Sequence, residues 1–207
     1  MSKTEPDIYV YKMVADNGGA PCVSGNLLSL AICKPKIRRT AGKESLIFGF
    51  GGKGYEERLI YIARVTGKLE GNAYYRQREY ARRADCIYRL ENDQPVRKLS
   101  AKYHLDSDQR KKDVGLHFEN AFVLMSEDFR YLGQKGTDDF KKRYPNLRRL
   151  IENLKQGHRR FHSAELRDEL LTLKDEIWTK YRRMQVGIPS EKDRSRPCNG
   201  ESPSASC

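Results

Sequence analysis

Residues 37–66 read IRRTAGKESLIFGFGGKGYEERLIYIARVT and contain two dense apolar runs around a glycine-rich connection. In residues 46–50 and 59–65, apolar side chains occur on both alternating faces, which is typical of strands that are covered on both sides. The connection over residues 51–58 is polar and rich in glycine, so it predicts an exposed hairpin loop. We therefore expect this strand pair to form the centre of the fold.

Two further strands and a helical turn are expected before this pair. Residues 7–13, DIYVYKM, alternate in the manner of a strand, and residues 27–33, LLSLAIC, form a second apolar run. Between them, residues 16–22 read DNGGAPC, which is typical of a loop because the glycines favour positive backbone angles and Pro21 stops a helix. Residues 36–42 are expected to form a short helical turn after Lys34-Pro35.

After the central pair, the sequence predicts one helix and several short strands. The tyrosine- and arginine-rich residues 72–83 show no strand alternation and are interpreted as a helix. Residues 100–115 are polar and are expected to be irregular. Short strands are expected over residues 86–90, 96–99, 119–125 and 128–133.

The hydrophobic period becomes helical in the C-terminal part. Thr137 or Asp138 is expected to cap a short helix, Asn146 a second one and Ser163 a longer one. The longer helix carries an apolar stripe that is expected to pack on the sheet. That stripe consists of Leu166, Leu170, Leu173, Ile177 and Tyr181. Residues 188–207 contain almost no large apolar side chains, so we expect a disordered tail.

Together these patterns predict a single α+β domain over residues 7–187. It is expected to consist of a curved, mostly antiparallel sheet or a small mixed β-barrel, with packed helices that include the C-terminal ones. The chain of 207 residues is long enough for one such core.

The charge balance points to a polyanionic partner. Forty Lys and Arg side chains against 28 Asp and Glu give a formal net charge of +12. Such an excess favours binding to nucleic acid or to an anionic nucleotide. The alternative is that many of these charges are solvated helix faces, because net charge carries no information about the fold.

The sequence excludes a membrane protein and a disulfide scaffold as interpretations. No stretch approaches the roughly 18 apolar residues that span a bilayer, and the N-terminus lacks the apolar centre of a signal peptide. The five cysteines show neither a disulfide framework nor a CxxC zinc pattern, so reduced thiols are expected. We expect a soluble, intracellular protein of the cytoplasm.

The loop over residues 16–22 is the first candidate for a site. Backbone N–H groups around Gly18 and Gly19 can form an anion-binding nest, and Asn17 can contact a base edge. Asp16 can act as a general base, and Cys22 as a nucleophile if a base lowers its pKa. The alternative is a tight glycine turn with a buried structural cysteine, which is favoured for Cys22 because no partner base is near it in sequence.

A basic cluster before the central pair is the second candidate. It comprises Lys34, Lys36, Arg38 and Arg39. Arginine can hold phosphate through a bidentate fork and lysine as a point charge, whereas the alternative is a solvated surface turn. Because no aromatic residue is adjacent to the cluster in sequence, the surface turn is the favoured interpretation.

Aromatic side chains near glycines are the third candidate. Phe48 and Phe50 alternate with glycines that would let a flat ligand approach the backbone, and Tyr74 and Tyr75 follow soon after. Such rings can stack on bases, but a core position is the favoured interpretation for the two phenylalanines.

Residues 157–163 hold further polar candidates. His158 and His162 are four residues apart, a spacing that can bind metal on one helix face, but the flanking Gly157 and Ser163 indicate a turn between helices. We therefore predict no metal site here. The intervening Arg159 and Arg160 are candidates for phosphate contacts. His104 and His117 are isolated and support no assignment, no P-loop motif occurs, and the sequence does not identify a cofactor.

Several phrases resemble a known family. The segments IYVYKMVADNGGAPCV, LSLAICKPKIRRTA, LIFGFGG and RLIYIARVTG are similar to the nucleotide modification associated domain, the second of that series, over roughly residues 9–133. That resemblance implies a pathway that makes or handles modified DNA bases. It carries no catalytic residue over to this chain.

A looser similarity is to PUA-like modules, including the EVE and ASCH domains, in which a basic turn leads into a strand and then a second strand ending in a phrase like IARVTG. These modules are small mixed β-barrels, so the similarity implies a nucleobase pocket beside a basic groove. The present chain is larger than a minimal barrel, because residues 71–115 and the C-terminal helices are additional.

Three functional hypotheses remain open from the sequence. The first is recognition of nucleic acid, DNA more than RNA, or of a nucleotide with a modified base, in which residues 16–22 contact the base and the basic residues hold phosphates. The second is an enzyme that modifies a base through Asp16 or Cys22. The third is a basic module that interacts with a partner modification enzyme.

Overall fold

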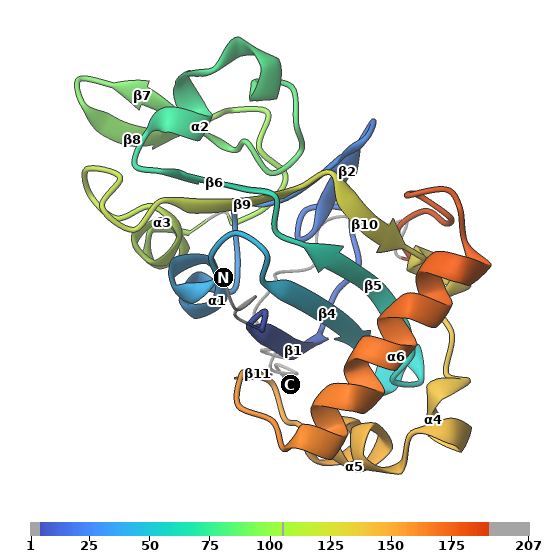
Figure 1. Ribbon diagram of the computed structural model, residues 1–207. Coiled ribbons are helices and arrows are strands. Elements are labelled where there is room, and N and C mark those ends of the chain that lie inside the picture. The colour runs from blue at the N-terminus through green and yellow to red at the C-terminus, as the bar shows by residue number, and fades with distance from the viewer. Residues whose placement is uncertain (1–4, 105, 191–207) are drawn as a thin grey trace, which may run out of the picture.

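The centre of the protein is a five-stranded sheet (Figure 1). The computed structural model describes residues 5–104 and 106–190. The order across the sheet is β10 (Asp128–Tyr131), β5 (Leu59–Arg64), β4 (Leu46–Gly51), β1 (Ile8–Met13) and β11 (His158–Arg159). β1 and β4 run parallel, and the other neighbours are antiparallel. The predicted pair β4 and β5 lies in the middle, and every residue of β4 is buried.

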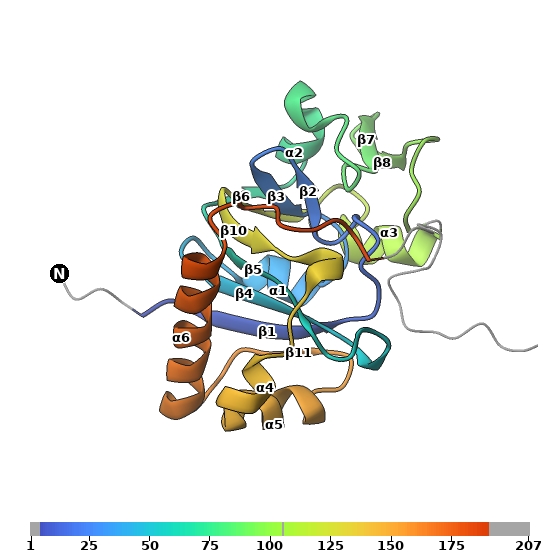
Figure 2. The same ribbon diagram turned by 90° about the vertical axis from the view of Figure 1, so that its right-hand side faces the viewer.

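The central sheet is covered on both faces, which explains why its strands are apolar on both. One face carries Phe48, Phe50 and Ile62 and packs against the C-terminal helices. These helices are α4 (Phe140–Arg143), α5 (Pro145–Asn153) and α6 (Ala164–Lys180), and Figure 2 shows α6 alongside the sheet. The predicted α6 stripe thus packs on the sheet, with Leu170 and Leu173 fully buried.

A second sheet covers the opposite face. Its order is β2 (Cys22–Ser24), β3 (Leu27–Leu30), β9 (Phe122–Ser126) and β6 (Gly67–Glu70), all antiparallel. Leu28 and Leu30 of this sheet share a core with Tyr9, Tyr11 and Tyr61 of the central one. The helix α1 (Pro35–Thr40) packs into the same core through Ile37.

A smaller layer completes the domain at the far side of the second sheet (Figure 1). It contains the hairpin β7 (Tyr88–Glu91) and β8 (Gln94–Arg97) and the short helix α2 (Ala73–Arg76). The short helix α3 (Ser107–Asp113) lies beside α1, where Arg38 contacts Asp113. The described residues also form three short 3-10 turns, which are η1 (Lys53–Tyr55), η2 (Arg78–Tyr80) and η3 (Gly133–Lys135).

The predicted α+β class with mostly antiparallel sheets is confirmed. The sheets of the described residues do not close into a barrel. No helix in the described ranges is long and apolar enough to cross a membrane.

Two local predictions were wrong. Residues 72–83 form the short α2 and η2 instead of one helix, and Tyr74 stacks on Tyr80 with ring centroids 4.8 Å apart. Residues 100–115 are not irregular throughout, because they contain α3, which Asp106 caps by accepting a hydrogen bond from the Gln109 N–H. The buried residues of α3 are the polar Gln109 and Asp113, so no apolar period marks this helix in the sequence.

The ends of the C-terminal helices differ in part from the prediction. Ser163 caps α6 by accepting a hydrogen bond from the Leu166 N–H, as predicted. Asn146 does not cap α5, which begins at Pro145. Residues 188–190 lie against the domain, where Ser190 donates to Asp16. The rest of the predicted disordered tail, residues 191–207, lies outside the described residues.

Gly49 provides a test of the packing in the central pair. A Cβ atom at Gly49 would overlap the Tyr61 ring on the neighbouring strand, so the glycine makes room for a tyrosine rather than for a ligand. We expect Gly49→Ala to lower the free energy of unfolding by about 1–3 kcal/mol, because overpacking forces neighbours from their rotamers. Urea denaturation measures this difference. The control is Gly42→Ala, where a Cβ atom meets nothing within 4 Å; equal stabilities of the two variants would contradict the packing.

Candidate active site

Cys33 lies in the turn that joins β3 to α1. The strand ends at Leu30, two fully buried residues follow, and α1 begins at Pro35. Cys33 and Lys34 both have left-handed backbone angles, with φ of 59° and 44°. Non-glycine residues rarely adopt this conformation, and it is concentrated at functional sites. The turn therefore holds the thiol in a conformation that the surrounding structure must enforce.

The thiol of Cys33 contacts an imidazole. Its Sγ lies 3.1 Å from Nε2 of His104, and Nδ1 of His104 makes a short hydrogen bond to Oδ2 of Asp113. His104 also has a left-handed backbone, with φ of 50°. The three side chains thus follow the order of nucleophile, base and orienting carboxylate that defines a catalytic triad.

The carboxylate of Asp113 is held by several donors. Oδ1 accepts a hydrogen bond of 3.0 Å from the Cys33 N–H, and Oδ2 accepts one of 3.1 Å from the Tyr88 hydroxyl. Nη2 of Arg38 lies 3.3 Å from Oδ1, and both side chains are almost completely buried. Because the same carboxylate binds the Cys33 backbone and the His104 ring, it fixes the thiol and the imidazole relative to each other.

Arg38 is part of this framework rather than a surface cation. Its Nε donates to the Cys33 carbonyl at 2.7 Å, and its Nη1 donates to the Phe122 carbonyl at 2.8 Å. The exposed fraction of Arg38 is 0%. Its guanidinium is enclosed by protein groups, so the structure places Arg38 in the interior instead of at the surface, and its predicted contact with phosphate stays a prediction.

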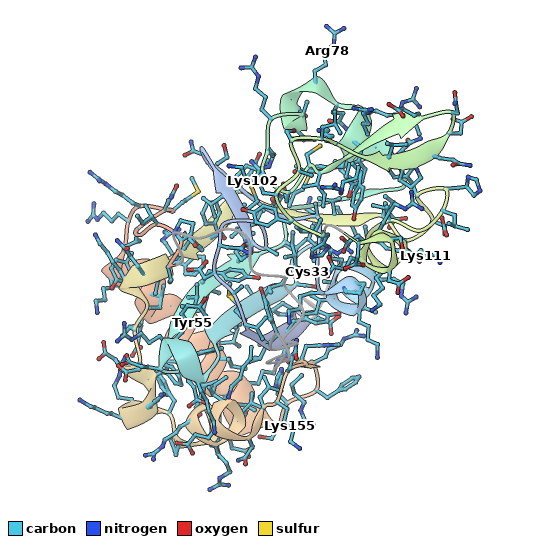
Figure 3. All side chains as sticks on the ribbon, turned by 180° about the vertical axis from the view of Figure 1, so that it is seen from behind. Cys33, Tyr55, Arg78, Lys102, Lys111 and Lys155 are labelled. Atoms are coloured by element: carbon cyan, nitrogen blue, oxygen red, sulfur yellow. The ribbon has the colours of Figure 1, made fainter. Side chains whose placement is uncertain are left out.

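A cavity of about 300 Å³ opens beside these residues. Cys33, Lys34, His104 and Asp113 form one part of its wall. The remaining lining residues are Pro35, Gln109, Lys112, Gln156 and Gly157. In Figure 3, which views the molecule from behind, Cys33 is labelled near the middle. The cavity has the size of a small-molecule pocket, and its polar groups converge near the thiol.

The loop over residues 16–22 is turned into the protein. The Asp16 carboxylate accepts hydrogen bonds from the Tyr131 hydroxyl at 2.5 Å and from the Ser190 hydroxyl at 2.8 Å. Asn17 is buried, and its Oδ1 accepts the Gly19 N–H at 3.1 Å. The Asp16 carboxylate and the Asn17 Oδ1 are occupied by protein groups, whereas the buried Asn17 Nδ2 has no hydrogen-bond partner among the described residues. A role for this loop in base recognition stays a prediction.

Cys22 lies in a different environment from Cys33. Burial and the nearby charge of Asp85 raise the pKa of the Cys22 thiol to about 12. Since the thiolate is the nucleophilic form, Cys22 is a poor nucleophile near neutral pH. Of the two cysteines, the geometry favours Cys33.

The predicted stacking rings lie in the interior. Phe48 and Phe50 are fully buried in the core, which agrees with the core interpretation. Tyr74 and Tyr75 are buried in the layer around β7, and the Tyr74 hydroxyl donates to Asp85 at 2.7 Å. The structure therefore leaves none of these four rings open for stacking on a base.

Four of the five remaining predicted phosphate contacts line one groove. Lys36 and Arg39 of α1 line a groove of about 510 Å³ together with Arg159 and Arg160. The other residues that line it are Thr40, Leu154, Lys155, Gln156, Gly157, His158 and Phe161. Lys34 lies apart from this groove and lines the cavity beside Cys33.

Sequence reasoning missed Cys33, His104 and Asp113 as a unit. His104 lies 71 positions after Cys33 in the sequence, and Asp113 lies 80 positions after it. Neither His104 nor Asp113 has a catalytic motif around it. The one local signal is a strand followed by a cysteine and a proline that opens a helix, which places the thiol in a strand-to-helix turn.

Alkylation tests whether Cys33 is the reactive thiol. We expect iodoacetamide at about pH 7.5 to modify Cys33 about tenfold or more faster than Cys22 or Cys86. Burial raises the pKa of both Cys22 and Cys86, whereas Cys33 lines a cavity. Peptide mass spectrometry measures the rates. The protein carries Cys198→Ser and Cys207→Ser, so that only the three cysteines within the described residues can react. Faster modification of Cys22 would contradict this assignment.

Comparison with known proteins places the chain in a family. Its sequence matches the family described as nucleotide modification associated domain 2 over residues 5–195. No curated protein and no solved structure matches. The match covers all of the described residues, including those that line the cavity and the basic groove. The chain therefore belongs to the nucleotide modification associated domain 2 family.

Proposed function

We propose that this domain is an enzyme that acts on a nucleotide or nucleic-acid substrate through a covalent intermediate on Cys33. The observation that carries the proposal is the contact of the Cys33 thiol with His104 and Asp113 at the edge of a cavity. The family associates the domain with nucleotide modification. The triad beside a cavity supports nucleophilic catalysis as the chemistry of this domain.

Each of the three residues has a distinct role in this proposal. His104 takes the proton of the Cys33 thiol through Nε2, which generates the thiolate. Asp113 accepts a hydrogen bond from Nδ1 and so directs Nε2 toward the sulfur. Asp113 also stabilises the imidazolium that forms when the proton moves, because its negative charge lies next to the ring.

The chemistry suits an sp² carbon that carries a leaving group, as in an amide, an ester or an amidine. The Cys33 thiolate forms a bond to this carbon, and the leaving group departs with the proton held by His104. A water molecule or an amine then attacks the covalent intermediate and gives its proton to His104. The carbon–sulfur bond breaks, and the original thiolate and imidazolium pair is restored.

A second candidate function is recognition of a nucleobase without chemistry. The basic groove beside the cavity favours it, because cations can hold phosphates while a pocket contacts the base. A PUA-like mode of binding, with the loop over residues 16–22 near the base, belongs to this candidate. It requires no reaction of Cys33, so substitution of the thiol separates the two functions.

The nucleoside composition of DNA tests the enzyme proposal. In cells that carry the associated modification genes, we expect Cys33→Ala or His104→Gln to remove the base change that the wild-type protein produces. Loss of a nucleophile or its base lowers the rate by at least about a thousandfold. The measurement is mass spectrometry of hydrolysed DNA, with circular dichroism to verify that each variant folds.

The matched control is Cys22→Ala, which removes a thiol outside the triad. It is expected to retain the base change if the variant is folded. Folded Cys33→Ala protein with the full base change would contradict the enzyme proposal. If the folded Cys22→Ala variant loses the base change while the Cys33→Ala variant keeps it, catalysis belongs to the loop over residues 16–22.

A further inference from the structure

We propose that a single-stranded polynucleotide binds along the basic groove between α1 and residues 154–161 and delivers a base to the cavity at Cys33. This inference rests on the proposed function, because it names the class of substrate that would reach Cys33. The groove and the cavity share two lining residues, Gln156 and Gly157. A chain held in the groove therefore lies next to the opening of the cavity.

The groove carries the charge that a phosphate backbone requires. Lys36, Arg39, Lys155, Arg159 and Arg160 line it, and none of its described lining residues is acidic. Arg160 pairs with Asp7 at 2.8 Å. Among the described ion pairs, none includes any of the other four cations.

The surroundings of His158 show the same positive potential. Burial lowers the pKa of His158, and the charges of Lys36 and Lys34 lower it further. His158 lines the groove, so the charges of Lys36 and Lys34 that act on its ring also act on the space of the groove. An anion in the groove would be attracted by the same charges.

An exposed ring lies beside these cations. Phe161 is 83% exposed, and the Arg160 guanidinium lies 5.6 Å from the centre of its ring. A phenyl ring in water beside a cationic groove is the arrangement with which single-strand binding proteins stack bases. Phe161 thus supplies the open aromatic surface that Phe48, Phe50, Tyr74 and Tyr75 do not.

The number of cations in the groove favours a polymer over a nucleoside monophosphate. A terminal phosphate carries about two negative charges, which is fewer than the cations that line the groove. A polynucleotide presents a repeated negative charge that matches several cations at once. A single strand fits better than a duplex, because a base must leave its stack before it can enter a cavity.

Binding of labelled oligonucleotides tests the inference. The protein carries Cys33→Ala so that no reaction takes place, and the probes are fluorescein-labelled 12-mers of thymidine or uridine and a 12-base-pair duplex. Fluorescence anisotropy between about 50 and 200 mM salt gives the affinity and its salt dependence. Thymidine monophosphate serves as a competitor.

Replacing Lys36 and Lys155 together by glutamate is expected to weaken binding of the single strand by about tenfold or more and to reduce its salt slope by about 1.4. The matched control replaces Arg76 and Arg78 by glutamate, which makes the same change in net charge at exposed positions outside the groove. Figure 3 shows Lys155 and Arg78 at opposite ends of the molecule. The control variant is expected to bind within about twofold of the parent.

Phe161→Ala is expected to weaken binding about fivefold or more, because it removes a stacking surface. Its control is Leu99→Ala, which shortens a side chain that is 94% exposed elsewhere. Equal losses in groove and control variants, stronger binding of the duplex, or equal competition by the mononucleotide would each overturn the inference. The thymidine and uridine probes distinguish DNA from RNA as the source of the strand.

The binding measurements do not depend on whether Cys33 reacts. Groove-dependent binding supports the inference even if Cys33 proves unreactive. Conversely, a reactive Cys33 with binding that ignores Lys36 and Lys155 overturns the groove alone and leaves the triad in place.

Discussion

The buried carboxylate of Asp113 is the group on which the candidate site depends. It lies in the interior, where an isolated charge is costly, and it is compensated by Arg38, Tyr88, His104 and the Cys33 backbone. Removal of one partner from such a buried pair typically costs about 3–5 kcal/mol, because the other charge is left unpaired. The cluster therefore joins the turn after β3, the end of α3 and the hairpin strand β7 into one unit.

This cluster also accounts for the unusual backbone near the thiol. Left-handed angles at Cys33, Lys34 and His104 are unfavourable for side chains other than glycine, at a cost on the order of 1–3 kcal/mol each. Hydrogen bonds from the Cys33 N–H to Asp113 and from Arg38 to the Cys33 carbonyl hold the turn from both sides. The same hydrogen bonds that maintain the strained turn bring the sulfur to the imidazole.

Local patterns were informative where burial follows a regular period. The central pair β4 and β5 and the stripe of α6 are apolar with the spacing of a strand and a helix, so the sequence predicts them. Arg38 and Arg39 show the limit of this approach. They are neighbours in sequence, yet consecutive residues of a helix point about 100° apart, so one is buried in the core and the other lines the basic groove.

The triad lies beyond such patterns. Its members come from separate parts of the chain, and α3 buries polar instead of apolar side chains, so periodicity does not distinguish it from a loop. The glycine-rich loop over residues 16–22 has the composition of a site but is packed inside. Only the tertiary contacts separate a thiol beside an imidazole, Cys33, from a buried one, Cys22.

The pH profile of Cys33 alkylation tests the central claim, activation of the thiol by His104, most directly. The rate is measured by mass spectrometry of the Cys33 peptide between about pH 5.5 and 9, in the wild-type protein and in His104→Gln. If the imidazole holds the proton of the thiol, the wild-type protein keeps a faster reaction at the acidic end than the variant. Identical profiles in two folded proteins would contradict the account.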